Sequence, residues 1–159
     1  MIAIVALCFF SACDSKRVFE EYRFVGNHGW HRDSAMVFSV PVRAPGSGYR
    51  MYLDVRNRGN YPNRNIWLSV AIHFPDGRQA TDTVEVVLAE PGGRWRGHGI
   101  GDLFDLQVLY KQDLTFPVAG EYQVRVKQAM RPTVLKGIQD IGVRLEKENS
   151  RKQKWERTN

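Results

Sequence analysis

Several stretches of the chain alternate between apolar and polar residues with a period of two, the pattern of a half-buried β-strand. The clearest is the segment 49–56, YRMYLDVR. Its apolar positions share one face: Tyr49, Met51, Leu53 and Val55. Its charged positions share the other face and are expected to point outward: Arg50, Asp54 and Arg56. The pattern predicts a strand with one face in the core.

The segment 66–74 predicts a central strand. Alternate residues form a wholly apolar face: Ile66, Leu68, Val70, Ile72 and Phe74. The opposite face, which contains Trp67 and Ala71, is also largely uncharged, as expected of a strand with neighbours on both sides. Pro75-Asp76-Gly77 follows and is typical of a tight turn, since proline fixes φ and glycine permits positive φ. We therefore expect a hairpin to the segment 81–88.

The other expected strands are 18–24, 35–42, 104–111, 114–120, 121–130 and 138–145. Pro41 cannot donate to a sheet ladder and places the strand 35–42 at an edge or at its own end. About eight short strands separated by turns predict an all-β fold, a two-sheet antiparallel β-sandwich of jelly-roll-like topology. The sandwich is expected over 18–146, and the polar residues 147–159 are expected to form a flexible tail.

The N-terminus has the pattern of a bacterial lipoprotein signal. Residues 1–12 are uncharged and too few to span a bilayer as a helix, which needs about 20 residues. Ser11 and Ala12 are small residues directly before Cys13, as cleavage by a lipoprotein signal peptidase requires. The expected mature chain therefore starts at a lipid-bearing Cys13 with a tether over 13–17. The alternative is an N-terminal core strand that contains Cys8 and Cys13.

The 159 residues fit one domain and carry a formal net charge of +6. Export excludes nucleic acid as a partner of this basic chain. Anionic lipid headgroups, lipopolysaccharide or an acidic protein patch remain, as does a solvated basic face without a specific partner. If Cys8 leaves with the signal, no thiol is free for a disulfide.

Candidate chemistry is sparse. His28, His31 and Asp33 are competent zinc ligands, but their spacing is that of a loop with solvated histidines, and we expect no metal or other cofactor beyond the lipid. The sequence GHGIG lacks the βαβ context and the Lys-Ser/Thr pair of a phosphate loop. Its glycines instead predict close backbone approach that lets Trp95 fold back on the sandwich.

The aromatic and arginine residues of the loops are candidates for partner binding. Arg94 and Arg96 flank Trp95 and form either a recognition edge or part of a loop packed for stability. Exposed Trp30, Tyr61 or Trp95 would also stack on sugar rings, as in carbohydrate-binding modules. Arg131 is expected to pair with a carboxylate such as Asp82 or Asp140. No nucleophile motif is present, and we expect no enzyme.

Three blocks of the chain resemble the GldH family of gliding-motility lipoproteins from the Bacteroidota. They are YPNRNIWLSV at 61–70, PDGRQATDTVEVVLAEPGGRWRGHGIGDLFD at 75–105 and GEYQVRVKQAMRPTVLKGIQDIGVRLEK at 120–147. The motifs that carry the likeness are Tyr-Pro…Asn-Ile-Trp-Leu, Asp-Thr-Val…Leu-Ala, Arg-Trp-x-Gly-x-Gly, Met-Arg and Leu-x-Gly-Ile-x-Asp-Ile-Gly. The resemblance implies an envelope lipoprotein that acts with the type IX secretion apparatus and has no known enzymatic reaction.

These observations combine into one hypothesis and one alternative. The hypothesis is a non-enzymatic lipoprotein that is an accessory or assembly factor of gliding motility and type IX secretion and docks a protein through its rim loops. The alternative is an envelope glycan-binding lipoprotein. We expect the outer membrane, facing the periplasm, although Asp14 after the lipidated cysteine retains lipoproteins in the inner membrane of some bacteria.

Overall fold

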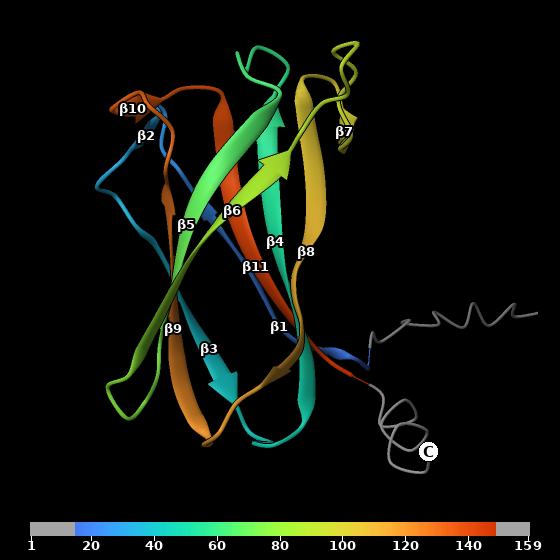
Figure 1. Cartoon of the computed structure of the whole chain (residues 1–159). Coiled ribbons are helices and arrows are strands. Elements are labelled where there is room, and N and C mark those ends of the chain that lie inside the picture. The colour runs from blue at the N-terminus through green and yellow to red at the C-terminus, as the bar shows by residue number, and fades with distance from the viewer. Residues whose placement is uncertain (1–14, 149–159) are drawn as a thin grey trace, which may run out of the picture.

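The computed structural model describes residues 15–148, which form two large antiparallel β-sheets packed face to face and one small two-stranded sheet (Figure 1). The expected signal peptide, Cys13 and residues 149–159 of the expected tail lie outside the described residues. Lys147, expected in that tail, instead ends the last strand of the sandwich. The two-sheet sandwich is confirmed.

Eight long strands build the two sheets in the described part of the chain. They are β1 Arg17–Phe24, β3 Met36–Val42, β4 Gly48–Arg58, β5 Asn65–His73, β6 Gln79–Val87, β8 Leu103–Thr115, β9 Gly120–Gln128 and β11 Ile138–Lys147. Three strands are short: β2 Trp30–His31, β7 His98–Ile100 and β10 Val134–Leu135.

The order of the strands is that of a jelly roll. One sheet, here the β4 sheet, has the order β1-β11-β4-β8-β7, and the other, the β5 sheet, has the order β3-β9-β5-β6. Counted among the long strands alone, these orders read first-eighth-third-sixth and second-seventh-fourth-fifth. That arrangement of two four-stranded sheets is the double Greek key expected from the sequence.

The core lies between the sheets and comes from the inward positions of each strand. Tyr49, Met51, Leu53 and Val55 of β4 are buried, as predicted. Ile66, Leu68, Val70 and Ile72 of β5 are buried opposite them, and Phe74 packs against this core. β5 lies between β9 and β6, so its prediction as a central strand is confirmed.

Local sequence accounts for the turns and edges. Gly77 has φ of 87°, and the Phe74 N–H donates to the carbonyl of Arg78 across the predicted β5–β6 hairpin. β3, which contains Pro41, is an edge strand, as predicted. The segment 114–120 was expected to be a strand with a turn. The turn is present, but the separate strand is wrong, because Leu114 and Thr115 belong to the end of β8.

The two ends of the sandwich differ in what they carry. Arg17 at the start of β1 pairs with Glu146 near the end of β11, so both termini of the described chain leave from one end, here the anchor end (Figure 1). β2, β10 and β7 gather at the opposite, distal end. Within residues 15–148, no helix is long and apolar enough to cross a membrane.

Candidate functional site

Trp95 lies at the distal end and covers the mouth of the sandwich. It forms an isolated bridge with Ala89, and its ring centroid is 5.8 Å from that of Phe104 and 6.5 Å from that of Tyr61. The indole is half-buried against the core. The expectation that Trp95 folds back on the sandwich is confirmed.

The glycines after Trp95 let the strand β7 lie directly on β8. A Cβ on Gly97 would lie 2.9 Å from the carbonyl oxygen of Asp105, and a Cβ on Gly99 would lie 1.8 Å from that of Leu103. No side chain fits either position without moving backbone, so the predicted close approach is confirmed. The same segment, expected to be loop, contains the short strand β7.

Two of the candidate binding aromatics, Trp30 and Tyr61, are buried. Trp30 is 0% exposed and its indole N–H donates to the carbonyl of Ser34 at 2.8 Å. The Tyr61 hydroxyl donates to the carbonyl of Asn65, and burial raises the pKa of Tyr61 to about 12. The expectation that these rings are exposed for stacking is wrong, because both fill space under the distal loops.

Arg94 and Arg96 are both exposed beside Trp95. Arg96 Nε is 2.8 Å from Glu90 Oε1, an ion pair that closes the loop on itself. Arg94 contributes its carbonyl to the Glu90 N–H. Their role in partner binding stays a prediction.

Ile100 is the most exposed large apolar residue in the described chain, at 94%. It forms the tip of the β7–β8 hairpin at the distal end, next to Gly101, whose φ is 65°. Phe24, at the distal end of β1, is 50% exposed. The sequence analysis did not single out Ile100. An isoleucine between two glycines in a turn indicates an exposed apolar side chain, since the neighbouring residues have no side chains to cover it.

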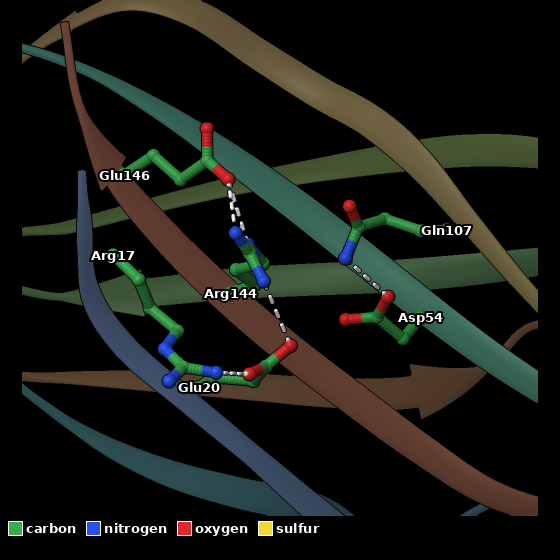
Figure 2. A network of polar contacts seen from close by, with 6 residues as sticks. All are labelled: Arg17, Glu20, Asp54, Gln107, Arg144 and Glu146. Atoms are coloured by element: carbon green, nitrogen blue, oxygen red, sulfur yellow. Dashed lines mark hydrogen bonds and ion pairs between the residues drawn. The ribbon is translucent and has the colours of Figure 1, made fainter. Parts of the chain in front are cut away.

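A layer of polar contacts covers the outer face of the β4 sheet. Arg144 of β11 lies between Glu20 of β1 and Glu146, at 3.2 Å and 2.5 Å, and Arg17 pairs with Glu20 (Figure 2). Arg50 extends the layer through Glu148. These charges neutralise one another along the face.

Asp54 lies within this layer but is only 1% exposed. One carboxylate oxygen accepts a 2.8 Å bond from Gln107 Nε2, and the other has no partner (Figure 2). Burial raises the pKa of Asp54 to about 6, and the nearby Asp105 and Glu20 act in the same direction. Asp54 does point away from the core as predicted, but it does not reach solvent.

Gly142 explains why Asp54 is covered. A Cβ at this position would lie 2.9 Å from the Cβ of Asp54 and 2.9 Å from the ring of Tyr22. The Tyr22 ring therefore lies across the sheet, with the Arg56 guanidinium 3.9 Å from its centroid. A glycine inside a strand marks such a close approach, and this was the signal in the sequence.

The proposed pairing of Arg131 is wrong. Asp82 pairs with Lys111 at 3.2 Å, and Asp140 lies 3.9 Å from Arg56, which also pairs with Asp105. Arg131 extends from the loop after β9, where its backbone carbonyl accepts a bond from Arg32.

The histidines of the first loop lie at the surface. His31 Nδ1 is 3.6 Å from Asp33 Oδ2, and both side chains are exposed. His28 lines a surface cavity of about 330 Å³ together with Arg58 and Lys136. Among residues 15–148, no three His, Cys, Asp or Glu side chains form a group that could hold a metal ion.

Comparison with known proteins decides the family. The model of the family described as GldH lipoprotein matches residues 17–145, which is nearly the whole sandwich. The gliding motility lipoprotein GldH of Flavobacterium johnsoniae is 38% identical over 156 residues, covering 94% of this chain and 96% of that relative. This chain belongs to the GldH lipoprotein family. The gliding motility lipoprotein GldH homolog of Christiangramia forsetii is 35% identical over 94% of this chain and 95% of its own length.

Membership of the GldH family supports a role in gliding motility and a membrane-anchored position in the cell envelope. The family is named for a motility lipoprotein and not for a reaction. No solved structure matches the chain.

Several motifs that carry the resemblance to GldH pack together at the distal end. Trp95 of Arg-Trp-x-Gly-x-Gly contacts Tyr61 of Tyr-Pro. A Cβ on Gly137, from Leu-x-Gly, would lie 2.8 Å from the Cα of Tyr61. The Gly137 carbonyl also accepts a 2.8 Å bond from the Arg58 N–H. The distal end is therefore a tightly built unit and a rigid base for anything exposed upon it.

Proposed function

We propose that this GldH-family lipoprotein is an accessory or assembly factor of the gliding and type IX secretion machinery that works by docking a partner protein at its distal end. Cys13 carries the lipid, and the sandwich holds the rim away from the bilayer. Only three residues lie between Cys13 and Arg17, and the four backbone steps that join the two span at most about 14 Å, so the anchor end stays near the membrane.

The observation that supports this proposal is the placement of Ile100. A 94% exposed isoleucine on a hairpin tip costs solubility and contributes nothing to the core. It lies at the end opposite the anchor, where a partner is reached without obstruction by the bilayer. Arg94 and the half-buried Trp95 precede Ile100 in the same segment and are of the residue types enriched at interface hot spots.

Gene replacement in the bacterium that carries this chain tests the proposal. The deletion strain receives the wild type, Cys13→Ser, Ile100→Asp or the control Leu109→Asp, which changes a 49% exposed residue on the outer face of β8. We expect the wild type and Leu109→Asp to restore colony spreading and cell-surface secretion. Cys13→Ser and Ile100→Asp should fail at equal protein levels, and full restoration by Ile100→Asp would contradict docking at the rim.

We also propose that the anchor lies in the outer membrane with the sandwich in the periplasm. Membrane separation should recover the protein with outer-membrane markers, and intact cells should protect it from added protease. Digestion in intact cells would place the sandwich on the cell surface.

A further inference from the structure

The excess positive charge of the molecule is not spread evenly over the two sheets. The outer face of the β4 sheet is neutralised by its own ion pairs, which join Arg144 to Glu20 and Glu146, and Arg56 to Asp105. The outer face of the β5 sheet instead carries cations without acidic partners. The asymmetry points to the β5 sheet as the face that meets an anionic ligand.

Three exposed cations follow one another on β9 and the loop after it: Arg125, Lys127 and Arg131. None of them forms an ion pair within residues 15–148. Their neighbours on adjacent strands are uncharged, since Arg125 lies opposite Ala71 and Val37, and Lys127 lies opposite Ser69. We call these three residues the basic row.

The basic row leads to a groove at the distal end that contains Trp67. This groove has a volume of about 480 Å³ and is lined by Asn63, Asn65, Trp67, Ala129, Met130, Arg131 and Pro132. The indole of Trp67 is 40% exposed. A second groove of about 460 Å³ shares Asn63 and Asn65 and continues past Glu85 to Arg96, so the surface suits an elongated ligand.

The wall of the groove is rigidly held. Gln128 is 3% exposed, accepts a bond from the Met130 N–H at 2.8 Å and donates to the carbonyl of Pro132 at 2.9 Å. Arg32 donates to the carbonyls of Met130 and Arg131 from the other side. The backbone N–H of Trp67 donates to the Met130 sulfur at 3.3 Å. The ring and the guanidinium of Arg131 are therefore presented by a preformed surface.

We propose that the Trp67 groove and the basic row bind a polysaccharide whose sugar rings carry carboxylates. One ring stacks on the Trp67 indole, the amides of Asn63 and Asn65 bond its hydroxyls, and Arg131 and Lys127 pair with carboxylates along the chain. A planar guanidinium binds a carboxylate through two parallel hydrogen bonds. This is a different surface from the buried Trp30 and Tyr61, and the inference goes beyond docking at the rim.

The surroundings of Trp67 favour a glycan over other anionic ligands. An acidic peptide would pair with the cations but would not need an exposed aromatic ring, whereas a sugar ring stacks on one, and the groove offers such a ring among amides and a guanidinium. Anionic lipid headgroups would favour cations at the anchor end, whereas Arg131 and Trp67 lie at the distal end. Acids are few on this face: Glu85 accepts a bond from Asn65, and Glu121 lies at the far end of β9.

Calorimetric titration of the lipidated protein in a sugar-free, uncharged detergent tests the proposal. The probe is oligogalacturonate, with neutral dextran, poly-L-glutamate and glycerol phosphate, the water-soluble headgroup of an anionic lipid, as comparisons. We expect oligogalacturonate to bind at least about tenfold more tightly than each comparison. Trp67→Ala and Arg131→Gln should each weaken binding by about tenfold or more.

Two control variants separate the groove from general effects. Arg43→Gln removes an exposed cation at the anchor end and makes the same charge change as Arg131→Gln, and Phe24→Ala removes an exposed ring from the other sheet. Both should stay within about twofold of the wild type. An unchanged far-ultraviolet circular dichroism spectrum and an unchanged melting temperature show that each variant keeps the fold.

Other outcomes overturn the proposal in distinct ways. Equal binding of poly-L-glutamate without dependence on Trp67 would indicate an acidic protein ligand. Binding of glycerol phosphate alone would indicate an anionic lipid headgroup. Absence of binding to oligogalacturonate would remove the glycan site. None of these results changes the expectation for Ile100, so the two proposals fail separately.

Discussion

Asp54 is a buried carboxyl group on the outside of a sheet, and its position has a thermodynamic cost. It has a single hydrogen-bond donor, Gln107, and its second oxygen is unpaired. Its pKa is about 6 in the folded protein, against an ordinary value of 3.8. The folded state therefore binds the proton more tightly than the unfolded state, and Asp54 lowers stability as the pH rises through this interval.

Replacement of Asp54 by Asn removes this ionisation. Below about pH 4, Asp54 is protonated in both the folded and the unfolded state, so its ionisation does not affect the free energy of unfolding. Above about pH 6, Asp54 is ionised in both states, and the wild type is destabilised by the full amount. We expect the stability of Asp54→Asn relative to the wild type to rise between these values by at most about 3 kcal/mol. Urea denaturation across this range measures the difference. A difference that does not change with pH would contradict the buried, ionisable Asp54.

The sequence predicted the direction of Asp54 but not its burial. Alternation along β4 assigns a residue to a face, and it does so correctly for Leu53 and Val55. It does not reveal what lies on the outer face, because the Tyr22 ring that covers it belongs to β1. The burial of Trp30 was not predicted for a different reason. Trp30 lies in a turn-rich segment, which has no periodic pattern from which burial can be recognised.

At the scale of elements, long strands were predictable and short ones were not. The regular alternation of β5 and the proline of β3 gave a central strand and an edge strand, and both are confirmed. β2 and β10 have two residues each, too few for any period to appear. β7 was not predicted because its glycines are typical of a loop. In the structure these glycines let β7 lie directly on β8.

The β7–β8 hairpin gives a test at this scale. A methyl group at Gly99 would lie 1.8 Å from the Leu103 carbonyl oxygen, so Gly99→Ala must open the hairpin. We expect faster amide hydrogen exchange over 95–104 and a loss of roughly 1–3 kcal/mol in stability. Gly92→Ala is the matched control, since a Cβ there meets open space. Exchange in Gly99→Ala equal to that in the control would contradict the packing of β7 on β8.

At the scale of the whole molecule, the jelly-roll order brings together parts of the chain that the sequence keeps apart. Tyr61, Trp95 and Gly137 meet at the distal end although each comes from a different motif. Strand patterns fix neither this order nor the distribution of charge, because both depend on which strands pair. The resulting molecule has an anchor end, a distal rim with Ile100 and a basic sheet face with Trp67.

The most direct test of the docking proposal is site-specific photo-crosslinking in living cells with the Cys13-anchored protein. A photoreactive residue at position 100 reports on the distal rim, and one at position 43 reports on the anchor end. We predict that position 100 gives adducts with gliding or type IX secretion proteins, identified by mass spectrometry, and that Cys13→Ser abolishes them. Adducts with such proteins at position 43 alone, or none at position 100, would contradict the docking of a partner at the distal rim.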